Sequence, residues 1–291
     1  MKNPFFTGVC TALVTPFLKG AVNYPMLEQL LKRQMDAGIR SIVVCGTTGE
    51  AATLSDTEKL TIVQRAKEYT ADNCKIIAGT GSNSTQHAVE LSVSAQNMGA
   101  DALLVVSPYY NKATPEGLIA HYEAIATAVH IPVILYNVPS RTGVDMSPEV
   151  YQKLAQIPNI VGVKEASRDI TKFAKIKHLC PASFAVWSGN DDMIVPVLSL
   201  GGAGVVSVLS NVAPAETRSM SDAALDGDFD TAAALQLQLL PLTELLFREV
   251  NPIPVKAAMK LIGYDCGDCR LPLTKLAEGN LEELKKQLSL R

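Results

Sequence analysis

The sequence is short of the features that mark a nucleic-acid or membrane protein. Its formal net charge is only −3, and it has neither a basic cluster nor basic residues interleaved with aromatic ones, which argues against a nucleic-acid backbone as partner. No uninterrupted apolar run approaches the ~20 residues needed to cross a bilayer. The first residues also lack the apolar segment of an export signal. We therefore expect a soluble cytoplasmic protein that binds neither nucleic acid nor membrane.

Motifs for metals and disulfides are equally scarce. The four histidines are scattered, and none belongs to an HExxH helix, so we expect no metal and no cofactor. The six cysteines stand mostly alone in apolar stretches, as reduced thiols of cytosolic proteins do. Cys266 and Cys269 have CxxC spacing without a second pair, so zinc is not expected. A redox-active or adventitious thiol pair remains open there.

What is present is a regular alternation of short apolar runs with amphipathic segments. The 291 residues are 47% hydrophobic and 19% charged, a globular balance. Nearly continuous Val, Ile and Leu runs are typical of parallel strands that are buried on both faces. Eight such runs start roughly 20–35 residues apart: Gly8–Val14, Ser41–Cys45, Lys75–Gly79, Ala102–Val106, Pro132–Tyr136, Ile160–Lys164, Phe184–Ser188 and Gly204–Val208.

Helical patterns fill the intervals between these runs. Ser55 and Glu58 form a capping-box pattern, and Ser147-Pro148 reads as a cap followed by proline at the first helical position. Eight strand–helix units favour a closed TIM (β/α)8 barrel over the alternative, a doubly wound open sheet. Further helices are expected at 213–225, 229–248, 254–261 and 281–288. We therefore predict an α/β fold with the barrel in residues 1–225 and a C-terminal helical extension in residues 226–291.

Polar residues follow the predicted strands where a TIM barrel would place its active site, at the carboxyl ends. Lys164 is the most informative of them, because it continues the apolar strand 160–163. Alternation puts Ile160, Gly162 and Lys164 on one face, with space above Gly162. Desolvation favours the neutral amine, which is the nucleophile that forms a Schiff base with a ketone. The alternative is a structural lysine that pairs with Glu165 or binds a phosphate.

Other residues at the same end of the barrel suit the same chemistry. Tyr136, Tyr110 and Thr47 offer hydroxyls for a proton relay, although each could equally serve packing or a turn. Thr48 lies in a Gly-Thr-Thr-Gly turn whose donors suit a small carboxylate. Arg141 carries a fork that binds carboxylates, or it is an ordinary solvated loop residue.

Three motifs in register resemble a known family. Gly46-Thr-Thr-Gly-Glu50, Tyr136-Asn-Val-Pro139 followed by Gly143, and Val163-Lys164 are similar to the pyruvate-dependent aldolases that include dihydrodipicolinate synthase and N-acetylneuraminate lyase. The resemblance covers essentially the whole chain. It implies a TIM barrel, pyruvate held as a Schiff base on Lys164, and usually a homotetramer built as a dimer of dimers.

Two residues make the chain resemble the synthase branch of that family. In that branch an arginine, here Arg141, receives the carboxylate of L-aspartate 4-semialdehyde. A tyrosine, here Tyr110, crosses the dimer interface and completes a relay with Thr47 and Tyr136. Gly189 and Val206 would line the pyruvate pocket, and Thr48 would bind its carboxylate. The implied reaction condenses pyruvate with the semialdehyde to 4-hydroxy-tetrahydrodipicolinate, which opens the diaminopimelate route to lysine.

The chain departs from the lysine-inhibited members of the family. Their inhibitor site uses histidines and a glutamate at positions that here are Ala51, Asp56, Lys59 and His87. A histidine in place of the carboxylate removes the partner of the ligand's ammonium group, so we predict weak or no inhibition by lysine. Two alternative functions remain at this point: a sialic-acid or keto-sugar-acid lyase of the same family, and a non-catalytic barrel that senses a metabolite.

Overall fold

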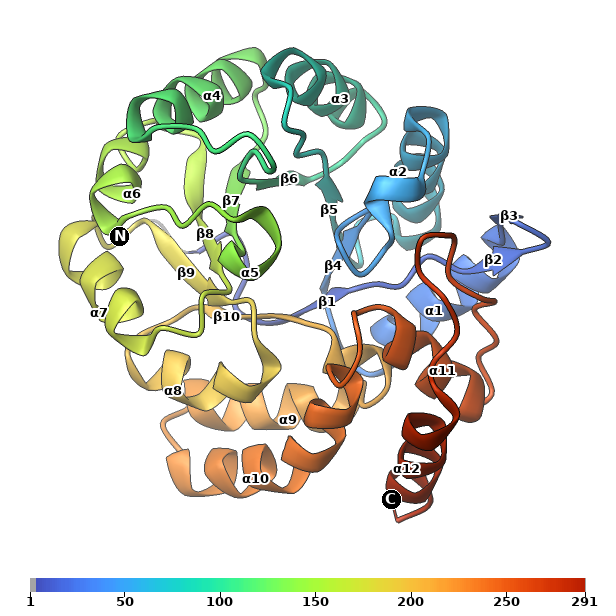
Figure 1. Cartoon of the computed structure of the whole chain (residues 1–291). Helices are drawn as coiled ribbons and strands as arrows, with labels where there is room; N and C mark the ends of the chain where they lie inside the picture. Colours follow the sequence, from blue (N-terminus) through green and yellow to red (C-terminus); the bar gives the residue numbers. More distant parts are fainter. Residues whose placement is uncertain (1–3, 291) are drawn as a thin grey trace.

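A closed ring of parallel strands forms the centre of the computed structural model, which describes residues 4–290 (Figure 1). Within that range eight strands pair side by side, and the last pairs with the first. The predicted TIM barrel is therefore confirmed, with strand ends within two residues of those expected. The strands are β1 (Gly8–Ala12), β4 (Ser41–Val44), β5 (Lys75–Gly79), β6 (Ala102–Val106), β7 (Val133–Asn137), β8 (Ile160–Glu165), β9 (Ala185–Ser188) and β10 (Gly204–Ser207).

Helices surround this ring and hide its outer face (Figure 1). They are α1 (Tyr24–Asp36), α2 (Asp56–Thr70), α3 (Thr85–Asn97), α4 (Pro115–Ala128), α6 (Pro148–Leu154), α7 (Ile170–Leu179), α8 (Ile194–Ser199) and α9 (Pro214–Leu225). The predicted capping box of Ser55 and Glu58 is confirmed at the start of α2. Ser147 is the N-cap of α6 and proline follows it at the start of the helix, as predicted, although the Ser147 side chain makes no capping hydrogen bond to the described backbone.

Short elements that apolar periodicity does not reveal fill the connections. An antiparallel hairpin of β2 (Phe17–Leu18) and β3 (Ala21–Val22) precedes α1. One helical turn, α5 (Pro139–Thr142), lies over the middle of the barrel mouth (Figure 1). The 3-10 turns are η1 (Ala51–Thr53), η2 (Asp191–Met193) and η3 (Leu209–Asn211). Each has four residues or fewer, too few to display a helical period.

The C-terminal part consists of α10 (Phe229–Leu246), α11 (Ile253–Leu261) and α12 (Glu278–Ser289). Helix α10 packs on the outside of α9, and α11 lies beside α12 (Figure 1). The segment after α11 returns to the hairpin and to α2: Cys266 O accepts from Phe17 N at 2.9 Å, and the Arg270 guanidinium binds Glu58. The C-terminal extension is therefore attached to the barrel through the β2–β3 hairpin and α2.

Two apolar layers hold the barrel, one inside the ring and one between the ring and the helices. The pairing of β7 with β8 shifts by one residue, because Val133 faces Ile160 while Ile134 faces Gly162. This bulge sends Ile160 to the outer layer, so the prediction that it shares the face of Lys164 is wrong. The space expected above Gly162 is filled, since a Cβ there would lie 2.7 Å from the Trp187 ring.

Candidate active site

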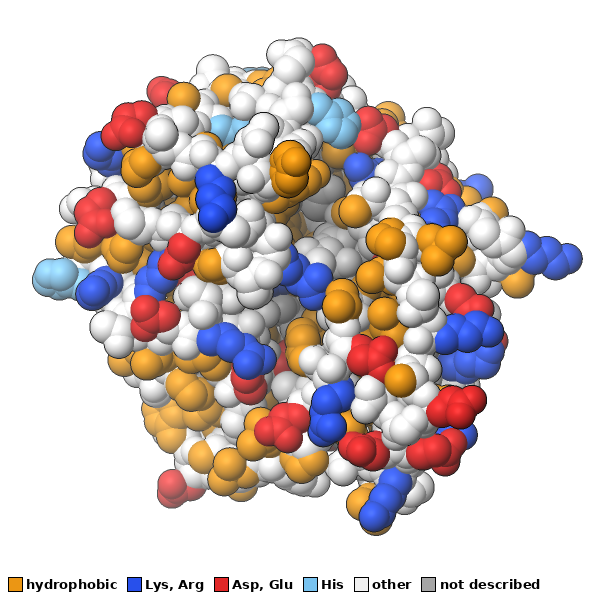
Figure 2. All heavy atoms as spheres, viewed as in Figure 1, with side chains coloured by type: hydrophobic (Ala, Val, Ile, Leu, Met, Phe, Trp, Pro, Cys, Tyr) orange, Lys and Arg blue, Asp and Glu red, His pale blue; other side chains and the backbone are white. Residues whose placement is uncertain are grey.

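Lys164 lies at the carboxyl end of β8 and reaches the inside of the barrel mouth. It is 6% exposed, and its Nζ is 4.3 Å from the centre of the Tyr136 ring on the neighbouring strand β7. Among the described residues no carboxylate lies within 4 Å of this nitrogen. The alternative of a pair with Glu165 is excluded, because strand alternation sends Glu165 to the opposite face. Figure 2 shows this end of the molecule hollowed near its centre.

Gly189 borders Lys164, and Val206 lies in the inner layer of the same barrel. Gly189 follows β9, and a Cβ at this position would lie 3.1 Å from Lys164 Cε and 2.6 Å from Ala166 Cβ. The absence of a side chain therefore lets the lysine stem pass. Val206 lies on β10, is 1% exposed and packs in the same inner layer as Tyr136. Gly189 thus shapes the wall of the mouth beside the lysine stem.

A polar cluster that we did not predict fastens the two strands from outside. Asn137 Nδ2 donates to both Glu165 carboxylate oxygens, at 2.9 and 3.1 Å, and Tyr151 Oη donates to Glu165 Oε2 at 2.9 Å. Burial, then the Glu165 charge, raises the pKa of Tyr151 well above its usual range. Asn137 and Glu165 directly follow Tyr136 and Lys164, so the cluster holds in register the strand ends that present those two residues. The sequence offered one signal for this cluster, because each of these two polar residues directly follows a predicted site residue.

The loop after β4, residues 46–50, is anchored by buried hydrogen bonds to residues far along the chain. Thr48 is 3% exposed, and its Oγ1 accepts from Asn251 Nδ2 at 2.9 Å. Glu50, in the left-handed region at φ 56°, accepts from Lys256 Nζ at 2.9 Å and from the Arg270 backbone N–H at 2.8 Å. The partners Asn251, Lys256 and Arg270 all come from the C-terminal extension. We did not predict them, because nothing local in the sequence connects them to this loop.

Arg141 extends from α5 at the rim of the mouth. It is exposed, and its Nη2 donates to the Asn251 backbone oxygen at 3.4 Å. Within the described chain it forms no ion pair with a carboxylate. Most of its guanidinium donors are therefore unpaired within the described chain.

The three hydroxyls of the predicted relay are not connected within one chain. Tyr136 is 6% exposed and Thr47 is half-buried, whereas Tyr110 is 85% exposed and has φ +75°. No hydrogen bond in the part of the chain that the structure describes joins any two of these hydroxyls. Within the described chain, Tyr110 is therefore exposed and has no hydrogen bond to the other two hydroxyls.

A buried acid lies close to this centre. Asp191 is 2% exposed, and its Oδ2 accepts from the backbone N–H groups of Val208 and Leu209 at 2.9 and 3.0 Å. Burial raises the pKa of this carboxyl, and the charge of Lys164 is among the influences that lower it. The sequence placed Asp191 after a strand, but nothing in its local pattern distinguished it from Asp192.

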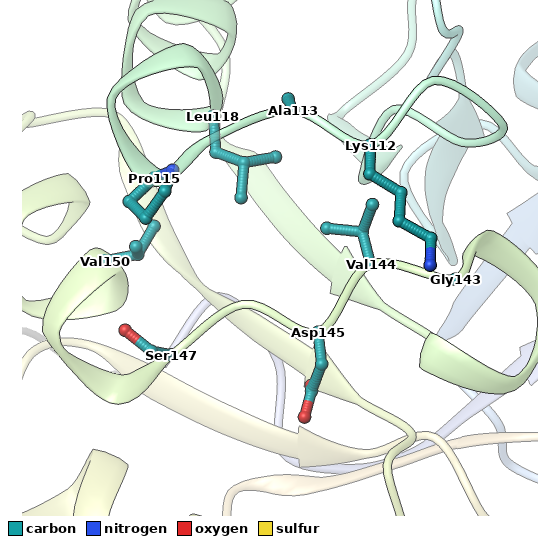
Figure 3. A pocket seen from close by; sticks show the side chains of 9 residues that line it. All are labelled: Lys112, Ala113, Pro115, Leu118, Gly143, Val144, Asp145, Ser147 and Val150. Carbon is teal, nitrogen blue, oxygen red and sulfur yellow. The ribbon is translucent and has the colours of Figure 1, made fainter.

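A separate pocket opens beside the site, between α4 and the segment that joins α5 to α6. It has a volume of about 230 Å³, and Figure 3 shows its lining, with Lys112 and Asp145 on its polar side and Leu118, Val144 and Val150 among its apolar residues. Lys164 is not part of this lining. The described residues contain no group of three or more His, Cys, Asp or Glu side chains that could hold a metal ion. None of the described helices is long and apolar enough to cross a membrane.

Comparisons with known proteins agree with this geometry. Residues 5–291 match the family described as "Dihydrodipicolinate synthetase family". A relative from Acetivibrio thermocellus named 4-hydroxy-tetrahydrodipicolinate synthase is 49% identical over 288 residues, which cover 99% of this chain and 98% of the relative. The solved structure of dihydrodipicolinate synthase from Aquifex aeolicus has a TM-score of 0.97 at 42% identity and covers 98% of each chain.

A second solved structure is that of the chloride-inhibited dihydrodipicolinate synthase from Acinetobacter baumannii complexed with pyruvate. It has a TM-score of 0.94 at 43% identity and covers 98% of each chain. The family model, the sequence of the relative and the two solved structures thus each match nearly the full length of this chain. The protein therefore belongs to the dihydrodipicolinate synthetase family.

Proposed function

We propose that this enzyme condenses pyruvate, bound as a Schiff base on Lys164, with L-aspartate 4-semialdehyde to give 4-hydroxy-tetrahydrodipicolinate. The observation that carries the proposal is the placement of Lys164: a buried amine at a barrel mouth, beside Tyr136 and with no described carboxylate within 4 Å. The names of the relatives support the same substrate pair and do not favour a sugar-acid lyase. A sensor without chemistry would have no need for such an amine.

The chemistry begins at the Lys164 amine. Its lone pair attacks the ketone carbon of pyruvate, water leaves, and the resulting iminium draws electrons from the adjacent methyl group. Loss of a methyl proton gives an enamine, whose carbon then bonds to the aldehyde carbon of the second substrate. The amino group of that substrate displaces Lys164 from the imine and closes the ring. Tyr136 and Thr47 move protons in these steps, since neutral hydroxyls can pass them along a chain.

The two carboxylates take different partners. Thr48, in the firmly anchored loop 46–50, binds the carboxylate of pyruvate, with Gly189 and Val206 as the walls that shape its pocket. Arg141 at the rim binds the carboxylate of the semialdehyde, which must approach after pyruvate has been fixed. A bidentate guanidinium contact positions this acid as well as attracting it.

Tyr110 acts in the site of a second copy of the chain. An 85% exposed tyrosine with a left-handed backbone is a costly surface feature in an isolated chain. In a two-fold dimer each copy gives Tyr110 to its partner and receives one in return. The assembly that follows from the family resemblance is a homotetramer, a dimer of such dimers.

The same proposal places the enzyme in the cytoplasm, and it assigns a role to the extension. All six cysteines are free thiols, which fits a reducing compartment. We assign residues 1–225 to the barrel and residues 226–291 to an extension that completes the mouth through Asn251 and Lys256.

A coupled assay tests the reaction, with NADPH oxidation by dihydrodipicolinate reductase as the readout. The wild type should turn over with the two substrates, and borohydride should fix pyruvate on the protein. Lys164→Ala should abolish both, whereas the matched surface variant Lys175→Ala, one helix away, should keep both. Full activity in Lys164→Ala would rule out the Schiff base. If borohydride traps pyruvate on the wild type but the coupled assay shows no turnover, the Schiff base stands and the second substrate is a different aldehyde.

A further inference from the structure

Asn251 forms hydrogen bonds with both proposed carboxylate-binding residues. It lies between α10 and α11 and is 5% exposed. Its side chain donates from Nδ2 to Thr48 Oγ1 at 2.9 Å, while its backbone oxygen accepts from Arg141 Nη2 at 3.4 Å. The side chain of Asn251 thus binds Thr48, and its main chain binds Arg141.

The direction of the first hydrogen bond determines what Thr48 can do. A hydroxyl has one proton to donate and can accept with its lone pairs. Because Thr48 Oγ1 accepts from the amide, its own proton is free, and among the described residues it donates to no other group. A carboxylate can only accept. The amide of Asn251 therefore leaves Thr48 with the proton that pyruvate needs.

The other end of the amide also points to a role beyond packing. Asn251 Oδ1 is buried and has no hydrogen-bond partner in the described chain. Most buried polar atoms are paired, so an orphaned acceptor next to a site calls for an explanation. Burial also limits the amide to a narrow range of orientations, which an exposed asparagine would not have.

We infer that Asn251 is a positioning residue that sets the Thr48 hydroxyl as a donor to the pyruvate carboxylate. The inference rests on the proposed function, because it assumes that Thr48 meets pyruvate. It assigns to the C-terminal extension a share in the affinity for the first substrate. The main-chain contact with Arg141 is independent of the side chain, so substitutions of Asn251 separate the two substrates.

The test compares Michaelis constants for the two substrates in Asn251→Ala and Asn251→Asp. Asn251→Ala should raise KM for pyruvate about 10-fold, with kcat and KM for the semialdehyde within about 2-fold of wild type. Asn251→Asp has the same shape but accepts the Thr48 proton and adds a negative charge. It should raise KM for pyruvate about 100-fold. If Asn251→Ala does not fold, the isosteric Asp variant still decides the question.

A double-mutant cycle with Thr48→Val separates positioning from general support of the fold. Since Asn251 is inferred to act through the hydroxyl, Asn251→Ala should add less than about 2-fold to KM in the Thr48→Val background. Additive losses, equal changes in both Michaelis constants, or wild-type behaviour of Asn251→Asp would each overturn the inference. Failure of the wild type to trap pyruvate would overturn the proposed function instead.

Discussion

Two loops at the mouth of the barrel differ sharply in how they are held. The loop after β4, residues 46–50, is mostly buried and bound by Asn251, Lys256 and Arg270. The segment after β6, residues 109–112, is exposed, and no side-chain hydrogen bond within the described chain holds it. The first loop is complete within one chain. The second has no such support within the described chain.

The difference teaches where the enzyme gains rigidity. A site for a small carboxylate needs fixed donors, so its loop is tied by buried charges that are expensive to leave unpaired. On the proposal that Tyr110 enters the site of another copy, its segment cannot be tied to its own chain. On the proposed function, the same mouth therefore combines a firmly anchored half with a half that a second copy of the chain completes. Four changes should break or sharpen this contrast.

The largest effect should come from removing the buried cation of the anchored loop. Lys256 and Glu50 are 3% and 4% exposed, so Lys256→Met leaves a buried carboxylate without its partner and should cost about 3–5 kcal/mol of unfolding free energy. Chemical denaturation measures it. The double variant Glu50→Gln/Lys256→Met has no orphaned charge and should recover part of the loss. Wild-type stability in Lys256→Met would mean that the pair does not anchor the loop.

A substitution in the exposed segment, residues 109–112, should change the catalytic rate and not the stability of the fold. Tyr110→Phe should lower kcat about 10- to 100-fold, because a relay hydroxyl is lost, with an unchanged melting temperature. Co-assembly with Lys164→Ala tests the crossing. Random pairing puts one intact site in half of the dimers, so about a quarter of wild-type activity should return. If the two variants co-assemble but activity does not rise above the residual activity of the parents, Tyr110 acts in the site of its own chain.

A smaller effect on stability should come from the ion pair of Arg270 with Glu58, which lies next to the anchored loop 46–50. Arg270 Nη1 and Nη2 donate to the Glu58 carboxylate at 2.9 and 2.5 Å, and the hydrogen bond from Arg270 is the main cause that lowers the pKa of Glu58 from 4.5 to about 2. A depressed carboxyl pKa stabilises the fold above the unfolded value and loses this contribution as pH falls through the folded one.

Glu58→Gln should therefore cost on the order of 1 kcal/mol at pH 7. The gap from wild type should close between pH 4.5 and about 2. Glu68→Gln on the same helix is the matched control, since Glu68 only accepts a hydrogen bond from Gln64. A gap that persists at low pH would show that the pair contributes through packing and not through charge.

The smallest expected effect is that of lysine on activity. Asp56, at the start of α2, is already engaged by His87 Nε2 at 2.8 Å and Lys59 Nζ at 3.3 Å, and the bond from His87 is the main cause that lowers the pKa of Asp56. Half-inhibition should need more than about 1 mM lysine. His87→Glu, which supplies a carboxylate for the ligand's ammonium group, should strengthen inhibition. Submillimolar inhibition of the wild type would contradict the prediction.

Some site residues could be found from the sequence because their signals are local. Lys164, Tyr136 and Thr48 each follow an apolar run, and parallel strands bring their carboxyl ends to one edge whatever the loops do. The prediction failed at Ile160, where a bulge against β7 reversed the face, and above Gly162, where Trp187 fills the expected space. Both errors arise from neighbouring strands, which a single strand's pattern cannot report.

By itself, the sequence determined the barrel, the order of its strands and the amine at the end of β8, because these depend on short-range periodicity and on the geometry of parallel sheets. Only the tertiary structure decided which partners complete the mouth. Asn251 meets Thr48 across 203 residues, and Lys256 meets Glu50 across 206. Contacts at such separations depend on how the extension packs against the barrel, and residue type and spacing along the chain carry no record of that packing.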